Sequence, residues 1–268
     1  MWRKTGLIGR DDLLKNKIVK RLRAKTGYVL VGQHGIGKTA ILEWSYDYVD
    51  AKKAFISATW TTKDILKEIC SAWCLKVMNL KGEEAPKSSW QVAWMHEAIL
   101  GEKDGFIFID DIQSMTASTI QKFKAYRDRF VLVCSAVPPI RKEEMKRMLF
   151  GLQHITVKPI QKKDMIKIGK LAAVEVQSKT PVTDAVHASR GIPAHLLHAL
   201  RGEVTPDAIK GKNEEIDISP IFIIVIGGIV AFRSIGRSLD STSLTMLGGL
   251  GTAFVMVFRY FLFKGMKK

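Results

Sequence analysis

The stretch Gly32-Gln33-His34-Gly35-Ile36-Gly37-Lys38-Thr39 decides the fold. Its spacing, G-x-x-x-x-G-K-T, is that of a loop whose glycines let backbone N–H groups turn onto phosphate oxygens. An apolar run at 28–31 precedes the stretch and an amphipathic run at 40–44 follows it. The alternative, a chance glycine-rich turn, does not account for both flanks. The pattern therefore predicts a strand, a phosphate-binding loop and a helix whose positive N-terminal end favours anions.

This loop predicts a defined set of nucleotide contacts. We expect Lys38 to reach the β- and γ-phosphates, and the Thr39 hydroxyl to hold Mg²⁺. The other expected contacts to the nucleotide come from Gly32, Gln33, His34, Gly35, Ile36, Gly37 and Ala40. The predicted ligands are therefore ATP and Mg²⁺.

A second strand signal lies about seventy residues further along the chain, at 106–109. Four apolar residues in a row are typical of a parallel strand that is covered on both faces, and Asp110 and Asp111 follow directly. Ligands of open α/β sheets bind at the carboxyl ends of the strands. We therefore expect Asp110 to hold Mg²⁺ through water, as the acid of a Walker B strand.

These motifs together resemble those of AAA+ ATPases, over about residues 6–200. Gly9 and Arg10 resemble the N-terminal box of the origin-recognition and STAND-like branches, which lies over the adenine. Asp110-Asp111-Ile112-Gln113 resembles the Walker B end of bacterial replication initiators, and its Asp-Asp pair also occurs in STAND ATPases. The resemblance implies an α/β fold, with a P-loop parallel sheet flanked by helices and a small helical lid. It also places Asp111 where the water-activating Glu usually stands.

The resemblance further implies groups that act on the γ-phosphate. Ser135 ends the apolar strand at 130–135 and takes the place of the first sensor, although a simple turn serine is the alternative. An arginine finger, which reaches the nucleotide of the neighbouring subunit, is expected in the basic stretch that follows. Arg147 is the first choice for this finger and Arg141 the second.

The segment 189–197 resembles the second-sensor segment of the lid, which has the pattern Gly-x-Pro-Arg. This resemblance implies that Arg190 and Pro193 lie at the nucleotide. Ala194 occupies the usual arginine position. The lid contact to the γ-phosphate is therefore either missing or supplied by Arg190 or His195.

The chain carries a net charge of +16, and its basic residues are clustered. Residues 1–26 hold nine Lys or Arg against two Asp, and residues 119–170 hold thirteen against four acids. Such clusters favour a polyanionic partner, either nucleic acid or anionic membrane lipid, over an ordinary solvated surface. The three cysteines are too few and too scattered to suggest disulfides, which fits a reducing compartment.

Two uncharged runs of fifteen residues, 218–232 and 244–258, lie near the end of the sequence. A membrane span needs about twenty residues, a length that both runs reach if flanking arginines snorkel. Residues 221–231 have no polar face, which favours a membrane hairpin over two buried helices of a soluble subdomain. We expect two transmembrane helices in an inner or plasma membrane, with the ATPase domain in the cytoplasm.

The predicted domain organisation has five parts. A nucleotide-binding core covers 1–160, a helical lid 161–203, a linker 204–216, a transmembrane hairpin 217–264 and a basic tail 265–268.

Three hypotheses of function remain open on this organisation. The first is a membrane-anchored ATPase that forms a homo-oligomeric ring or arc, with nucleotide at the subunit interfaces, and moves or remodels a partner at the membrane. The second is a slowly hydrolysing, STAND-like switch that controls assembly. The third is a DNA-binding helper of replication or transposition.

Overall fold

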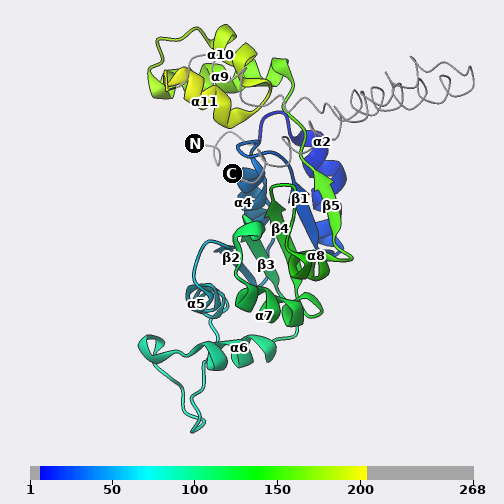
Figure 1. Ribbon diagram of the computed structural model, residues 1–268, viewed down its shortest axis with the longest axis vertical. Helices are drawn as coiled ribbons and strands as arrows, with labels where there is room; N and C mark the ends of the chain where they lie inside the picture. Colours follow the sequence, from blue (N-terminus) through cyan, green and yellow to red (C-terminus); the bar gives the residue numbers. More distant parts are fainter. Residues whose placement is uncertain (1–6, 204–268) are drawn as a thin grey trace, which may run out of the picture. The chain divides into compact units, whose positions relative to one another are not determined.

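The computed structural model describes residues 7–203. Five parallel strands form one sheet in the order β2-β3-β4-β1-β5 (Figure 1). Their bounds are Tyr28–Val31 for β1, Lys53–Ser57 for β2, Phe106–Asp110 for β3, Val131–Ala136 for β4 and Gln153–Thr156 for β5. The predicted α/β fold with a parallel sheet is thereby confirmed.

The strands are apolar because the sheet is covered on both faces. Alternate residues of one strand point to opposite faces, so Ile107 and Phe108 of β3 enter two separate cores. β5 is an edge strand in which Ile155 alone is buried. The order of strands sets β4 between β1 and β3, so the carboxyl ends of these three strands meet at one edge of the sheet.

Helices cover the two faces. One core holds apolar residues of α5 (Thr62–Ala72), α6 (Val92–Leu100), α7 (Ala117–Arg127) and α8 (Glu143–Leu149). The other core holds apolar residues of α4 (Lys38–Tyr48) and of the N-terminal helix.

Apolar residues recur at helical spacing between Leu13 and Leu22 and predict an N-terminal helix over 11–25, which ends at Arg23 in the structure. It consists of α2 (Asp11–Leu13), a π-helical turn η1 (Leu14–Ile18) and α3 (Val19–Arg23). Leu14, Ile18 and Leu22 are buried at intervals of four residues, so the apolar stripe continues through the wider turn. The lysines and arginines of this helix are left on its other faces.

The apolar spacing between Ile65 and Leu75 predicts a helix over 61–77, but α5 ends at Ala72 in the structure. The Leu75 N–H donates to the Cys70 carbonyl at 2.9 Å, and Cys74 adopts a left-handed conformation with φ +54. This is a Schellman-type end, which glycine usually signals, and no glycine stands here. A loop follows, with the short 3₁₀ turn η2 (Lys87–Ser89) before α6.

Three further helices form the lid. They are α9 (Lys162–Val176), α10 (Val182–Ser189) and α11 (Pro193–Leu200), and Figure 1 shows them grouped together. They share a core of their own. Pro193 is the first residue of α11, a position where its missing N–H costs no helical hydrogen bond.

Residues 7–203 contain no helix that is long and apolar enough to cross a membrane. The predicted linker, transmembrane hairpin and basic tail, at 204–268, lie outside the described residues.

Candidate nucleotide-binding site

The predicted phosphate loop connects β1 to α4. Gly35 and Gly37 adopt φ values of +75 and +96, in the left-handed region that glycine enters without steric cost. Ile36, which lies between them, is 1% exposed and anchors the loop in the core beside α4. The loop therefore curls around the N-terminal end of α4, where free backbone N–H groups favour an anion.

Lys38 is the first residue of α4 and is only 5% exposed. Its ammonium donates to the carbonyls of Gly32 at 3.0 Å and Gln33 at 2.9 Å. Burial lowers the pKa of Lys38, while Asp111 and Asp110 act in the opposite direction. A buried cation that is held by backbone carbonyls alone is well placed to receive a phosphate.

Thr39, Asp110 and Ser135 form a hydrogen-bonded chain across three elements. The Thr39 hydroxyl donates to Asp110 Oδ2 at 2.8 Å, and the Ser135 hydroxyl donates to Asp110 Oδ1. Ser135 also accepts from the backbone N–H of Asp111 at 2.9 Å. The pairing of Ile109 with Cys134 sets Ser135 beside the acids, so the sheet register creates this arrangement.

The oxygen atoms of Thr39 and Asp110 are ligands that suit Mg²⁺. Within residues 7–203, no group of three or more His, Cys, Asp or Glu could hold a metal ion. A divalent cation at this pair would therefore need phosphate oxygens and water as further ligands, as Mg²⁺ in nucleotide sites does.

Asp111 lines the cavity in front of the loop. Its backbone is left-handed, with φ +52 and ψ +48, a conformation that Asp tolerates better than most residues. Asp111 Oδ1 accepts from the Gln113 side-chain amide at 3.2 Å, and Gln113 Oε1 accepts from the Val137 N–H at 3.2 Å. Gln113 therefore holds the Asp111 carboxylate against the loop after β4. The motif at 110–113 contained this glutamine, but the sequence alone assigned it no role.

Arg10 is 7% exposed, and its hydrogen bonds go to the backbone. The guanidinium donates to the Ile36 carbonyl at 2.8 Å and also to the Lys158 carbonyl. Burial lowers its pKa to about 10. Gly9, with φ +75, lies so close to the start of the lid that an added Cβ would come within 2.9 Å of Ile160 Cγ2. Arg10 thus links the N-terminal box to the phosphate loop and to the segment between β5 and the lid.

The helical region predicted as the lid touches the phosphate loop directly at Ala194, the residue at the predicted second-sensor position. The Ala194 N–H donates to the Gly35 carbonyl at 3.2 Å. A Cβ added to Gly35 would come within 2.5 Å of the Ala194 Cβ, so these two backbones are in close contact. Neither Arg190, which is exposed at the end of α10, nor His195 lines the cavity. Burial lowers the pKa of His195, and the neighbouring His198 and His34 add to this effect.

The cavity between the loop, the N-terminal box and the lid has a volume of about 370 Å³. The predicted residues that line it are Arg10, His34, Gly35, Ile36, Gly37, Lys38, Thr39, Ala40, Asp111 and Pro193. Sequence reasoning missed its apolar wall, which consists of Leu7, Ile8, Ile41, Ile160, Ile168 and Leu197. Leu7 and Ile8 stand directly before the Gly-Arg box, and this adjacency was the only signal for them. A polar loop opposite an apolar wall can hold a charged phosphate chain and a flat base at once.

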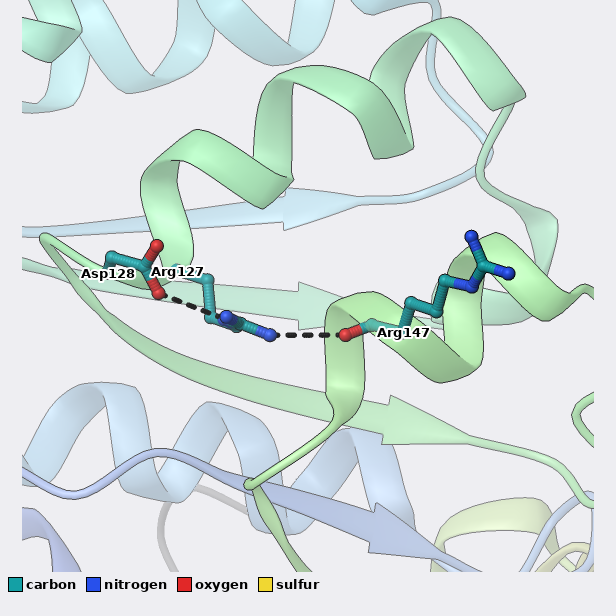
Figure 2. A network of polar contacts seen from close by, with 3 residues as sticks. All are labelled: Arg127, Asp128 and Arg147. Carbon is teal, nitrogen blue, oxygen red and sulfur yellow. Dashed lines mark hydrogen bonds and ion pairs between the residues drawn. The ribbon is translucent and has the colours of Figure 1, made fainter.

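The remaining predicted residues lie outside the cavity lining: Gly9, Gly32, Gln33, Asp110, Ser135, Arg147 and Arg190. Arg147 is exposed on α8, and its carbonyl accepts from Arg127 Nη1 at 3.1 Å. Arg127 also pairs with Asp128 at 3.1 Å. Figure 2 shows the Arg147 guanidinium directed away from both of these residues. Arg147 therefore lies outside the cavity lining of its own chain.

No protein-family model matches the chain, and no curated protein matches it. Two solved structures from Thermotoga maritima are similar in chain path. RuvB shares 15% identity over 90% of this chain and 85% of its own, with a TM-score of 0.47. Domain III of the replication initiation protein DnaA shares 14% identity over 79% of this chain and 88% of its own, also with a TM-score of 0.47. At these scores the likeness transfers no function, so any assignment depends on the residues of this chain.

Proposed function

We propose that the chain is an ATPase of the AAA+ type, which binds ATP and Mg²⁺ in the cavity between the phosphate loop, the N-terminal box and the lid. The observation that carries this proposal is the hydrogen-bonded chain from Thr39 through Asp110 and Ser135 to the Asp111 N–H. This chain brings together the Thr39 hydroxyl, Asp110 and the Ser135 hydroxyl from three elements that are far apart in the sequence. It also includes the backbone of Asp111 and lies beside the buried Lys38. A structural core has no need of this combination.

We expect the two sides of the cavity to bind different parts of the nucleotide. The phosphates would lie on the loop, near the ammonium of Lys38 and the N-terminal end of α4. The base would lie against the apolar wall near Ile8 and Leu197. Thr39 and Asp110 would hold Mg²⁺, which supplies positive charge against the negative charge that develops on the transferred phosphoryl group.

Hydrolysis requires a water molecule in line with the bond between the γ-phosphorus and its bridging oxygen. We assign the orientation of this water to Asp111, which lines the cavity and is held by Gln113. The water oxygen bonds to the γ-phosphorus, the bond between this phosphorus and the bridging oxygen breaks, and ADP leaves with the bridging oxygen. Asp111 accepts a hydrogen bond from the water, and the proton that the water loses passes to phosphate or solvent.

The change of Asp111 to Asn tests this assignment. We expect about a hundredfold lower rate of phosphate release, because a neutral amide accepts the hydrogen bond of the attacking water more weakly than a carboxylate and orients it less well. The affinity for ATP should stay within about threefold of the wild type, since the phosphates are held by other groups. The measurement is steady-state phosphate release beside equilibrium binding of a fluorescent ATP analogue.

The matched control for this variant is Asp104→Asn, which removes an exposed carboxylate paired with Lys25. It should hydrolyse ATP at the wild-type rate. If the wild type hydrolyses ATP rapidly and Asp111→Asn keeps that rapid rate, another group orients the water and the assignment is wrong.

The slow switch is the second candidate function, and the contact of Ala194 with Gly35 favours it. Here the lid meets the phosphate loop through a backbone hydrogen bond and no arginine reaches the cavity from α11. Asp111 is also one methylene shorter than the usual glutamate. In this case ATP binding would set assembly without rapid turnover, and wild-type phosphate release would be as slow as that of Asp111→Asn.

We also propose that the chain acts as a homo-oligomer at a membrane, with residues 217–264 as its anchor and the ATPase domain in the cytoplasm. The basis is the sequence of 218–232 and 244–258, which lacks charge. A protein truncated after 215 should move to the soluble fraction of a cell lysate, whereas the full chain should sediment with membranes. Equal partitioning of the two would contradict the anchor.

A further inference from the structure

A second groove, distinct from the nucleotide cavity, lies between the N-terminal helix and α4. It has a volume of about 400 Å³. Leu14 and Val19 form part of its apolar floor, Lys15 and Arg23 lie on the N-terminal helix, and Trp44 and Tyr48 lie on α4. We call it the Trp44–Tyr48 groove.

The aromatic wall of this groove is formed in advance. Trp44 and Tyr48 stand one turn apart on α4, and their rings stack with centroids 5.2 Å apart and planes at 18°. Tyr48 is 39% exposed. Arg23 Nε donates to the Tyr48 hydroxyl at 3.1 Å, which ties the phenol ring to the opposite helix. A flat ligand therefore meets an aromatic surface whose orientation is already set.

The opposite wall is cationic. Residues 11–23 contain five Lys or Arg against two Asp, and the buried leucines and isoleucine of the helix keep these cations on its other faces. Lys15 is exposed, and within residues 7–203 its ammonium makes no hydrogen bond or ion pair. Among the described residues that line the groove, Asp11 is the single acid. The groove thus combines positive charge with a stacking surface.

We propose that the Trp44–Tyr48 groove binds single-stranded nucleic acid, with a base stacked at Tyr48 and the adjoining phosphates on Lys15 and Arg23. Aromatic side chains beside a basic track bind unpaired strands because each base has a free π-face. A duplex hides these faces, so it would use the cations alone. A lipid headgroup would likewise need the cations but not the stacked rings.

The groove is connected to the nucleotide cavity through two elements. Helix α4 begins with Lys38 and Thr39 and carries Trp44 about one and a half turns later and Tyr48 about two and a half turns later. Leu7 lines both the cavity and the groove. Binding of the strand does not need ATP hydrolysis, so this inference goes beyond the proposed ATPase and can fail or hold independently of it.

The test is fluorescence anisotropy with the full-length protein at low salt. A labelled oligothymidylate is compared with an abasic strand of the same length and charge. We expect the oligothymidylate to bind at least about fivefold more tightly, because stacking of one base contributes at least this factor. Tyr48→Ala should abolish the preference for bases. Lys15→Gln should weaken both strands and lower the slope of log affinity against log salt by about one.

Residues that do not line the groove supply matched controls. Trp60→Ala removes an aromatic ring of 41% exposure that lies outside the groove, and Lys63→Gln removes an exposed cation of α5. Both should bind like the wild type. The affinity of Tyr48→Ala for a fluorescent ATP analogue should be unchanged, which separates loss of the groove from loss of the fold.

Three results would overturn the proposal. The first is equal affinity of the wild type for the oligothymidylate and the abasic strand. The second is a preference for bases that survives in Tyr48→Ala. The third is that the wild type binds neither strand but binds phosphatidylserine vesicles, with vesicle binding that Lys15→Gln weakens, which would assign the cations of the groove to lipid. If ATP binding also fails in the wild type, the proposed ATPase is wrong as well, and the two failures remain distinguishable.

Discussion

Replacement of Lys38 by alanine is expected to lower kcat/KM for ATP by about 10⁴-fold. The ammonium is 5% exposed and is held over the phosphate loop by the carbonyls of Gly32 and Gln33. Removal of one partner of a buried charge pair costs about 2–5 kcal/mol of binding free energy. The same ammonium would stabilise charge that develops in the transition state, so the rate of the bound complex falls as well.

The experiment measures phosphate release and binding of a fluorescent ATP analogue for Lys38→Ala and for Lys67→Ala. Lys67 is an exposed lysine of α5 and serves as the control. The Lys38 variant should still fold, because alanine suits a helix and no buried charge remains to be satisfied. Tight ATP binding by a folded Lys38→Ala variant would show that the loop does not hold the phosphates.

Replacement of Arg147 by alanine should lower the hydrolysis rate by about 10³-fold or more, the effect typical of an arginine finger. The affinity for ATP should change by less than about threefold, since the guanidinium is directed away from the residues beside it and lies outside its own cavity. Its exposure on α8, the helix that follows β4, leaves it available to a neighbouring subunit.

A mixing experiment separates a finger that acts on a neighbour from a purely structural arginine. Neither Lys38→Ala nor Arg147→Ala should hydrolyse ATP alone. In a mixture, a Lys38→Ala subunit presents its intact Arg147 to the intact loop of an Arg147→Ala subunit, and activity should return. Arg141→Ala is the matched comparison and should remain active. Activity lost in Arg141→Ala but retained in Arg147→Ala would transfer the role to Arg141, and absence of rescue would contradict action between subunits.

Much of the site could be predicted from local patterns because parallel strands end at one edge of the sheet. The apolar run before Asp110 and the glycine spacing before Lys38 each identify a strand end. Once both strands belong to one sheet, their polar ends must approach each other. The contact between Thr39 and Asp110, 71 residues apart in the sequence, follows from this topology.

The apolar wall of the cavity and the partners of Arg10 could not be predicted in this way. Arg10 resembles a residue that lies over the adenine, yet its guanidinium donates to the carbonyls of Ile36 and Lys158. The second of these partners lies 148 residues away. Backbone carbonyls carry no side-chain signal, so only the fold reveals which of them meet an arginine.

The left-handed backbone conformation of two residues also could not be predicted from the sequence. Asp111 and Cys74 are left-handed without being glycine, so neither residue type signalled the turn. At Cys74 this conformation ends α5 earlier than the apolar spacing predicted. At Asp111 it sets the carboxylate where Gln113 can hold it, a relation that the order of residues alone does not express.

The most direct test of the central claim is phosphate release by the full-length protein with saturating ATP and Mg²⁺, measured over a range of protein concentrations beside Lys38→Ala. If this cavity is an ATPase site that a neighbouring subunit completes, the rate per chain should rise with concentration to a plateau, while the variant stays at background. A rate per chain that equals that of Lys38→Ala at every concentration would contradict the claim.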